Sequence, residues 1–147
     1  MTGRVMAIDW GEVRLGLAMS DETQTIAQGF DVYERRSISD DIAHLARVID
    51  DHNVDRVVVG VPVHMDGSHS PQTEQARAFV NQLEATLAVP IEVMDERLTT
   101  SEAERSLLEA DLSRQKRKTK RDQLAATLIL QRYLERQRRR SSGQSDS

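Results

Sequence analysis

The sequence predicts one α/β domain built on a mixed five-stranded sheet that is flanked by helices, in the order β-β-β-α-β-α-β-α. Its 147 residues are enough to bury a core without disulfides or metal ions as staples. The apolar residues recur with the short period of strands near the N-terminus, and helical stripes alternate with strands further on. The first three strands are joined by connections too short for a helical crossover, so we expect an antiparallel meander there.

The meander is predicted from the N-terminal part of the chain. Residues 4–9 are a nearly continuous apolar run that ends on Asp9, as expected for a central strand covered on both faces. A turn over residues 10–12 leads into a second strand over residues 14–20. A weaker third strand follows over residues 25–31.

Helices and strands alternate in the rest of the chain. Apolar residues from Ile42 to Ile49 make one helical stripe, and the valine-rich residues 56–61 form a buried strand that Pro62 ends. The remaining predicted elements are a helix over residues 76–87, a strand over residues 91–95, a helix near residues 99–108 and a final helix over residues 122–134. We expect residues 1–135 to form the domain. We expect residues 136–147 to be a disordered tail, because they are rich in arginine and serine without an apolar anchor.

Charge is distributed unevenly along the chain. The net charge is −4, but residues 1–110 carry 9 basic against 20 acidic side chains, and residues 111–147 carry 11 against 4. A basic segment joined to an acidic body indicates a polyanionic partner such as nucleic acid, because lysine and arginine gain affinity by displacing counterions from phosphates. The alternative is a solvated helical face.

The composition excludes several classes of protein. There is no cysteine, so neither a disulfide nor a thiolate metal site can form, and a metal ion would be held by oxygen or imidazole. The N-terminus lacks a basic region followed by a long apolar core, and no apolar run reaches membrane-spanning length. We therefore expect a cytoplasmic protein without a membrane partner.

Acidic residues stand at three places where local structure does not require a charge. Asp9 ends one buried strand and the pair Asp95-Glu96 ends the last one, and a buried carboxylate needs a compensating partner or a metal ion. Asp122 precedes Ala126 by one helical turn, which places it on the core-facing stripe of the final helix. The alternative for Asp122 is a helix N-cap, a position that favours aspartate.

Together these carboxylates predict an all-oxygen site for Mg²⁺ or Mn²⁺, which are hard ions satisfied by carboxylate and water. Two such ions about 4 Å apart would activate a water molecule and stabilise the leaving 3′-oxygen during hydrolysis of a phosphodiester. Metal binding should be weak without substrate, because Mg²⁺ usually completes its shell with phosphate oxygens. The residues thus predict a metal-dependent nuclease with two ions in its substrate complex.

Four blocks of sequence occur in a fixed order over roughly residues 4–135. They are Asp9-Trp10-Gly11-Glu12-Val13-Arg14-Leu15-Gly16-Leu17-Ala18, then Val58-Val59-Gly60-Val61-Pro62 with Met65-Asp66-Gly67-Ser68, then Asp95-Glu96-Arg97-Leu98-Thr99-Thr100, and last Asp122-Gln123-Leu124-Ala125-Ala126. These blocks resemble the YqgF/RuvX family, nucleases assigned to pre-16S rRNA and related to Holliday junction resolvases. The resemblance implies a ribonuclease H-like fold and a divalent-metal-dependent endonuclease.

The resemblance also implies roles for single residues. It makes Asp9, Glu96 and Asp122 the metal-binding and catalytic carboxylates, and it alone selects Glu96 over Asp95. The chain departs from the family at Val13, where members usually carry a basic residue, so a substrate contact at that position is not expected.

Basic residues on both sides of these carboxylates are candidates for binding phosphate. Arg14 and Arg97 match family arginines, and the alternative for each is an ion pair with a nearby carboxylate. We interpret residues 114–121 as a phosphate-binding loop, against the alternative of a merely solvated run. Its six cations are Arg114, Lys116, Arg117, Lys118, Lys120 and Arg121.

The function that the resemblance favours is processing of the 5′ end of pre-16S rRNA in ribosome biogenesis. The alternative is resolution of four-way DNA junctions, which needs two symmetric active sites, so a homodimer would favour the junction and a monomer would favour RNA. Two further classes are a non-catalytic nucleic-acid-binding factor and an actin-like ATPase lobe. Loss of a carboxylate would have indicated the first, and the second requires another lobe that a chain of this length does not contain.

Overall fold

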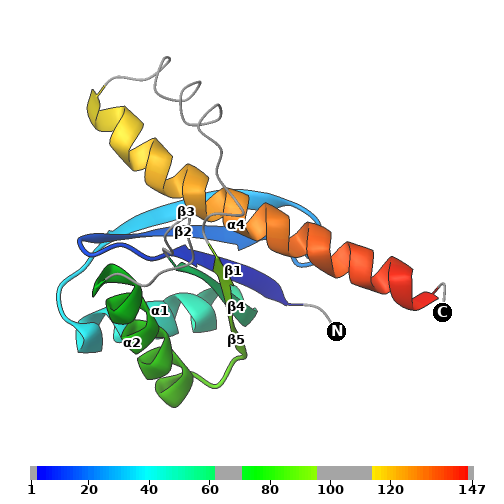
Figure 1. Cartoon of the computed structure of the whole chain (residues 1–147), viewed down its shortest axis with the longest axis horizontal. Coiled ribbons are helices and arrows are strands. Elements are labelled where there is room, and N and C mark those ends of the chain that lie inside the picture. The colour runs from blue at the N-terminus through cyan, green and yellow to red at the C-terminus, as the bar shows by residue number, and fades with distance from the viewer. Residues whose placement is uncertain (1–2, 62–70, 96–113, 146–147) are drawn as a thin grey trace.

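Five strands form one mixed sheet with the order β3-β2-β1-β4-β5. The computed structural model describes residues 3–61, 71–95 and 114–145, and in the last segment it describes side chains from residue 123 to residue 140 (Figure 1). The strands are β1 (Arg4–Asp9), β2 (Arg14–Ser20), β3 (Ala27–Glu34), β4 (Val54–Val61) and β5 (Ile91–Asp95). β1 is antiparallel to β2 and parallel to β4. The predicted meander and the mixed five-stranded sheet are confirmed.

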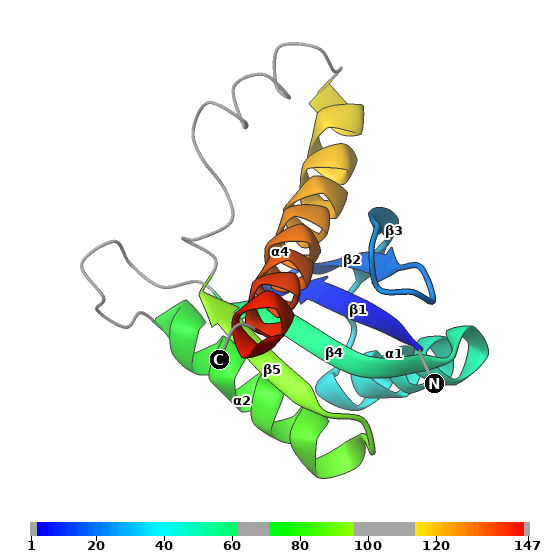
Figure 2. The same cartoon turned by 90° about the vertical axis from the view of Figure 1, so that its right-hand side faces the viewer.

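Helices cover both faces of this sheet. They are α1 (Ile38–His52), α2 (Pro71–Thr86) and α4 (Arg114–Ser145). α1 and α2 lie on one face and α4 crosses the other (Figure 2). The Ser37 hydroxyl caps α1 by accepting a hydrogen bond from the N–H of Asp40, and Asn53 ends it in a left-handed conformation with φ of 55°. The helix predicted near residues 99–108 lies outside the described residues. Among the described helices, none is both long and apolar enough to cross a membrane.

The residues of β1 divide between two cores by the two-residue alternation of a strand. Met6 and Ile8 pack on the side of α1 and α2, Val5 and Ala7 pack on the side of α4, and all four are fully buried. The α4 side of the core is completed by five residues of that helix, Ala126, Ile129, Leu130, Tyr133 and Leu134. β1 is therefore covered on both faces, as its sequence predicted.

β3 lies two to three residues later than the sequence predicted. The reason is a turn organised by Asp21, whose Oδ1 atom accepts hydrogen bonds of 2.8 Å from the backbone N–H groups of Thr25 and Ile26. The hydrogen bond from Ile26, followed by those from Thr23 and Thr25, holds the pKa of Asp21 well below its ordinary value. These residues are therefore bound in a turn and cannot join the ladder of β3.

α4 is longer than predicted at both ends. The sequence indicated a helix over residues 122–134, and the structure extends it from Arg114 to Ser145. Residues 114–121 are helical and do not form the predicted loop, and residues 136–145 continue the helix where a disordered tail was predicted. The physical reason is that arginine, lysine and glutamine have high helix propensity but supply no apolar period by which a helix is recognised.

Two close contacts join α4 to β4 and β5. Ile129 lies over Gly60 of β4 so closely that a Cβ atom at this glycine would collide with the Ile129 Cδ1 atom. Further along the helix, Nη1 of Arg56 on β4 donates to the Tyr133 hydroxyl at 2.6 Å and to Glu92 of β5 at 3.2 Å. Burial, and then Glu92, raises the pKa of Tyr133. The helix is thus fixed to both β4 and β5.

Gly60→Ala should lower the free energy of unfolding by about 1–3 kcal/mol, because the added methyl group overpacks the core against Ile129. The double variant Gly60→Ala/Ile129→Val should recover part of this loss, since it removes the carbon atom that the methyl group meets. Urea denaturation followed by circular dichroism measures both, with Ile129→Val alone as the control. If the effects of the two substitutions simply add, the contact is not the cause.

Candidate active site

Asp9 ends the central strand of the sheet between two glycines. Its register partners are Gly16 on β2 and Gly60 on β4, so neither partner has a side chain. The alternation that turns Val5 and Ala7 toward α4 assigns Asp9 to the same face. Neither neighbouring strand therefore places a side chain of its own beside the carboxylate, and over Gly60 the space is occupied by Ile129 of α4.

The environment of Asp9 suits a metal ligand. The residue is half-buried, and its Oδ1 atom is shielded from solvent. Asp9 also interacts with other groups of the protein. A carboxylate that is withdrawn from water needs such an interaction to compensate its charge. A divalent cation coordinated by oxygen atoms would also compensate this charge, so the donor chemistry at the end of β1 fits Mg²⁺ or Mn²⁺.

Asp122 lies in the interior of α4, the helix that covers the face of Asp9. It precedes Ala126 by one turn and Ile129 by two turns, and both of these residues are fully buried against the sheet. The helical period therefore assigns position 122 to the side of α4 that faces the sheet. The helix begins at Arg114, eight residues earlier, so the alternative of an N-cap at Asp122 is wrong.

The third predicted carboxylate, Glu96, lies outside the described residues, and so does Arg97. The strand before them is well placed, because Asp95 at the end of β5 is the register partner of Val61 at the end of β4. β4 in turn is parallel to β1, so the three strands end at the same edge of the sheet. Within the described ranges, histidine and acidic side chains form no group of three or more that could hold a metal ion.

Arg14 and residues 114–121 are the predicted phosphate-binding residues that lie within the described part of the chain. Arg14 begins β2 opposite Glu34 of β3 and interacts with its surroundings. The six cations of residues 114–121 occupy the first turns of α4. At about 1.5 Å per residue, the start of the helix is roughly 12 Å from Asp122 along its axis.

A buried ion pair that was not predicted from the sequence holds the turn between β1 and β2 in place. Nε of Arg35 lies 2.9 Å from Oδ2 of Asp41, which is fully buried. Nη1 of Arg35 donates to the carbonyl oxygen of Gly11 at 3.0 Å. The guanidinium carbon also lies 5.5 Å from the ring centre of Trp10 and 5.2 Å from that of Phe79. One side chain thus links the turn to both helices on this face.

A signal for this pair was present in the sequence. Asp41 falls with Leu45 and Val48 on the buried stripe of α1. A charged residue on an apolar stripe indicates a buried partner of opposite charge, and Arg35 precedes the helix by three residues.

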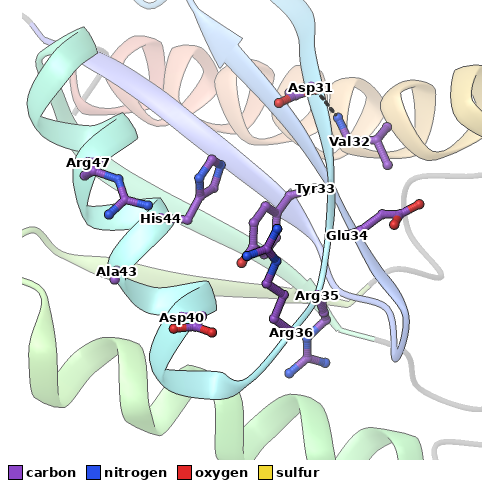
Figure 3. A pocket seen from close by; sticks show the side chains of 10 residues that line it. All are labelled: Asp31, Val32, Tyr33, Glu34, Arg35, Arg36, Asp40, Ala43, His44 and Arg47. Atoms are coloured by element: carbon purple, nitrogen blue, oxygen red, sulfur yellow. Dashed lines mark hydrogen bonds between the residues drawn. The ribbon is translucent and has the colours of Figure 1, made fainter.

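A cavity of about 520 Å³ lies between β3 and α1 (Figure 3). Tyr33 and His44 stack on each other at its wall, with ring centres 4.3 Å apart. Burial, and then the nearby Asp41, raises the pKa of Tyr33. The lining contains three acidic residues and three arginines, so it favours neither anions nor cations. It opens on the α1 side of the sheet, whereas Asp9 faces α4, so the cavity is separate from the candidate active site.

Arg35→Met should lower the free energy of unfolding by about 3–5 kcal/mol, because the buried carboxylate of Asp41 then loses its cation. Arg36→Met changes an exposed arginine next to it and should cost less than about 0.5 kcal/mol. Adding Asp41→Asn to Arg35→Met should restore part of the loss, since the uncompensated charge disappears. Chemical denaturation measures the free energy of unfolding of each variant. Equal losses for Arg35→Met and Arg36→Met would show that the buried ion pair has no special role.

The sheet order, the mixture of antiparallel and parallel pairing and the helices on both faces define a ribonuclease H-like α/β protein. Two solved structures share this fold. The RuvC protein of T. thermophilus in complex with a Holliday junction substrate has a TM-score of 0.53 and 14% sequence identity, covering 86% of this chain and 91% of that chain. The Holliday junction resolvase of the fowlpox virus has a TM-score of 0.52 and 16% identity, covering 90% and 98%. At these identities the likeness concerns the fold.

Relatives in sequence cover nearly the whole chain. A protein of Dictyoglomus thermophilum with the curated name "Putative pre-16S rRNA nuclease" is 43% identical over 132 residues, which are 90% of this chain and 95% of the relative. A protein of Natranaerobius thermophilus with the same name is 46% identical over 134 residues, 91% of this chain and 95% of the relative. The family model described as RuvX, Holliday junction resolvase, matches residues 3–136. The chain therefore belongs to the RuvX family.

Proposed function

We propose that this chain is a divalent-metal-dependent nuclease that hydrolyses phosphodiesters, and that its substrate is the 5′ end of pre-16S rRNA in ribosome biogenesis. The observation that carries the proposal is the position of Asp9, a carboxylate that ends the central strand between two glycines on the face covered by α4. The name shared by relatives of 43% and 46% identity supports the choice of RNA. An enzyme acting on pre-rRNA would work in the cytoplasm.

Asp9, Glu96 and Asp122 are the proposed ligands of Mg²⁺ or Mn²⁺. Met94 of β5 packs on the α4 side, so a strand that kept its alternation would bring position 96, and not position 95, to the face of Asp9. This alternation supports Glu96, which the family resemblance also selects. When bound, the ions would supply activation of a water molecule and stabilisation of the leaving oxygen. The chain would supply the carboxylates that hold and orient them.

Arg14, Arg97 and the cations in the first turns of α4 are the proposed contacts to substrate phosphates. Those turns directly precede Asp122 on the same helix, so a phosphate held there lies on the approach to the proposed metal site. Residues 1–110 are strongly acidic in sum, so a polyanion is repelled by the body of the protein and attracted to α4. Recognition by backbone charge suits a folded RNA whose bases are already paired.

The second candidate function is resolution of Holliday junctions in DNA recombination or repair. The description of the matching family favours it. A junction presents two strands for symmetric cleavage, so this function requires two copies of the active site related by a two-fold axis. Native mass spectrometry with and without a junction separates a homodimer from a monomer.

Asp9→Asn should reduce cleavage of a labelled pre-16S rRNA 5′ leader by at least about 100-fold, because loss of a metal ligand costs no less than loss of the groups that orient one. Asp51→Asn changes an exposed aspartate at the end of α1 and should cleave as the wild type does. A four-way DNA junction is assayed in parallel, with Mg²⁺ and with Mn²⁺. Cleavage of the junction alone supports the resolvase, and binding of both substrates by the wild type without cleavage contradicts a nuclease.

Glu96→Gln and Asp95→Asn compare the two neighbouring acids at the end of β5. Glu96→Gln and Asp122→Asn should each impair cleavage about as much as Asp9→Asn, whereas Asp95→Asn should retain most of the activity. Mn²⁺ affinity is measured by electron paramagnetic resonance in the presence of a non-hydrolysable substrate analogue. It should fall strongly in Asp9→Asn, Glu96→Gln and Asp122→Asn and only slightly in Asp95→Asn. The opposite order for positions 95 and 96 would assign the ligand to Asp95.

A further inference from the structure

The far end of α4 carries arginines that have no part in the proposed active site. Residues 131–140 contain five arginines and a single acidic residue, Glu135. Arg132, Arg136 and Arg139 are separated by four and three residues, so they lie along one side of the helix, and all three are exposed. We call these three residues the distal arginine stripe.

The distal arginine stripe lies far from the candidate active site. At about 1.5 Å per residue, Arg132 is roughly 15 Å and Arg139 roughly 25 Å from Asp122 along the helix axis. Tyr133, next to the stripe, is hydrogen-bonded to Arg56 near the start of β4, whereas the candidate site lies where the parallel strand β1 ends. This end of α4 extends past the edge of the sheet at which β1 begins (Figure 1). The stripe therefore cannot contact a phosphate held at the proposed metal site.

The charge of the stripe is little compensated. Nη2 of Arg139 lies 3.9 Å from Oε2 of Glu135, but the two side chains are 76% and 44% exposed. Such an exposed ion pair contributes little to stability and leaves the guanidinium group of Arg139 accessible. Among its described residues, α4 buries no apolar side chain beyond Leu134. The end of the helix thus offers a charged surface and not an apolar one. Such a surface fits a partner with closely spaced negative charges.

The helical period joins the stripe to the cations near the candidate site. Arg114, Arg121, Arg132 and Arg139 are separated by 7, 11 and 7 residues, which are nearly whole numbers of turns, so the four positions share one side of α4. They span about 37 Å, close to the 34–36 Å of one turn of duplex DNA. Phosphates along one groove of a duplex would therefore meet cations toward both ends of the helix.

We infer that the distal arginine stripe binds phosphates of the nucleic-acid segment that flanks the cleavage position, about 15–25 Å from the phosphate that is cut. The inference rests on the proposed function and adds a second contact region to it. The match to the family ends at residue 136, so Arg139 and its exposed neighbours Arg138 and Arg140 lie beyond the family pattern. The second region therefore includes residues that the family match does not cover.

The test compares two triple variants that remove the same charge. Arg132→Gln/Arg136→Gln/Arg139→Gln removes the stripe, and glutamine retains high helix propensity. Arg36→Gln/Arg47→Gln/Arg77→Gln removes three exposed arginines on the α1 and α2 side of the sheet. Affinity for a labelled RNA hairpin with a duplex arm, and for a four-way DNA junction, is measured over a range of salt concentrations. EDTA is present throughout, so that no cleavage takes place.

The plot of log K against log salt concentration has a negative slope, and the stripe variant should make it shallower by about 2–3. The reason is that each lost phosphate contact removes about 0.9 from the magnitude of the slope for duplex DNA and somewhat less for single strands. The control triple should keep the slope of the wild type. Equal slopes for the two triples overturn the inference but leave the proposed function intact. Failure of the wild type to bind either nucleic acid overturns both. Far-UV circular dichroism verifies that the variants keep the helix content of the wild type.

A length series gives a second readout that loss of folding would not imitate. On a short oligonucleotide that spans only the proposed metal site, the stripe variant should keep the kcat/KM of the wild type. On a substrate with a duplex arm long enough to reach the far end of α4, its KM should rise while kcat is retained. A loss of the same size on short and long substrates would show that the stripe does not act on the flanking segment.

Discussion

The rest of the structure depends on the close packing of α4 against the sheet at Gly60. Only a residue without a side chain admits Ile129 at this point of β4, and the contact limits how near the helix can approach this strand. The same helix closes one half of the core, carries Asp122 on one side of the contact and carries exposed arginines on the other. A helix moves nearly as a rigid rod, so the depth of this one contact governs positions many ångströms away in both directions.

The opposite face of the sheet restrains the strand that Asp9 ends. The ion pair of Arg35 and Asp41 is buried, and such pairs contribute little net stability because both charges must be desolvated. The pair instead fixes the position of the turn that directly follows β1, because Arg35 donates a hydrogen bond to the carbonyl oxygen of Gly11 and stacks over Trp10. The residues that directly follow β1 are thus held from the side of α1 and α2, whereas the Asp9 side chain at the end of this strand faces α4.

The sheet could be predicted from the sequence because buried strands such as β1 and β4 are short continuous apolar runs, a pattern typical of strands that are covered on both faces. Asp9 and Asp122 could be singled out because a charge at the end of an apolar strand, or in register with the apolar stripe of a helix, demands a reason, whereas the preference for Glu96 over Asp95 needed the family resemblance. Boundaries decided by side chains were not predictable. Asp21 delays β3 through hydrogen bonds to backbone N–H groups, and the charged ends of α4 are helical without an apolar period.

The helix beyond Leu134 buries no apolar side chain among its described residues, so this part of the chain is free to change without disturbing the core. Mutations that lengthen, shorten or recharge it would leave the strands, the acidic residues and the packing at Gly60 as they are. Affinity for the substrate and catalysis can therefore evolve separately. A lineage could adapt its hold on nucleic acid to the salt of its own cell while the reaction centre stays under strict selection.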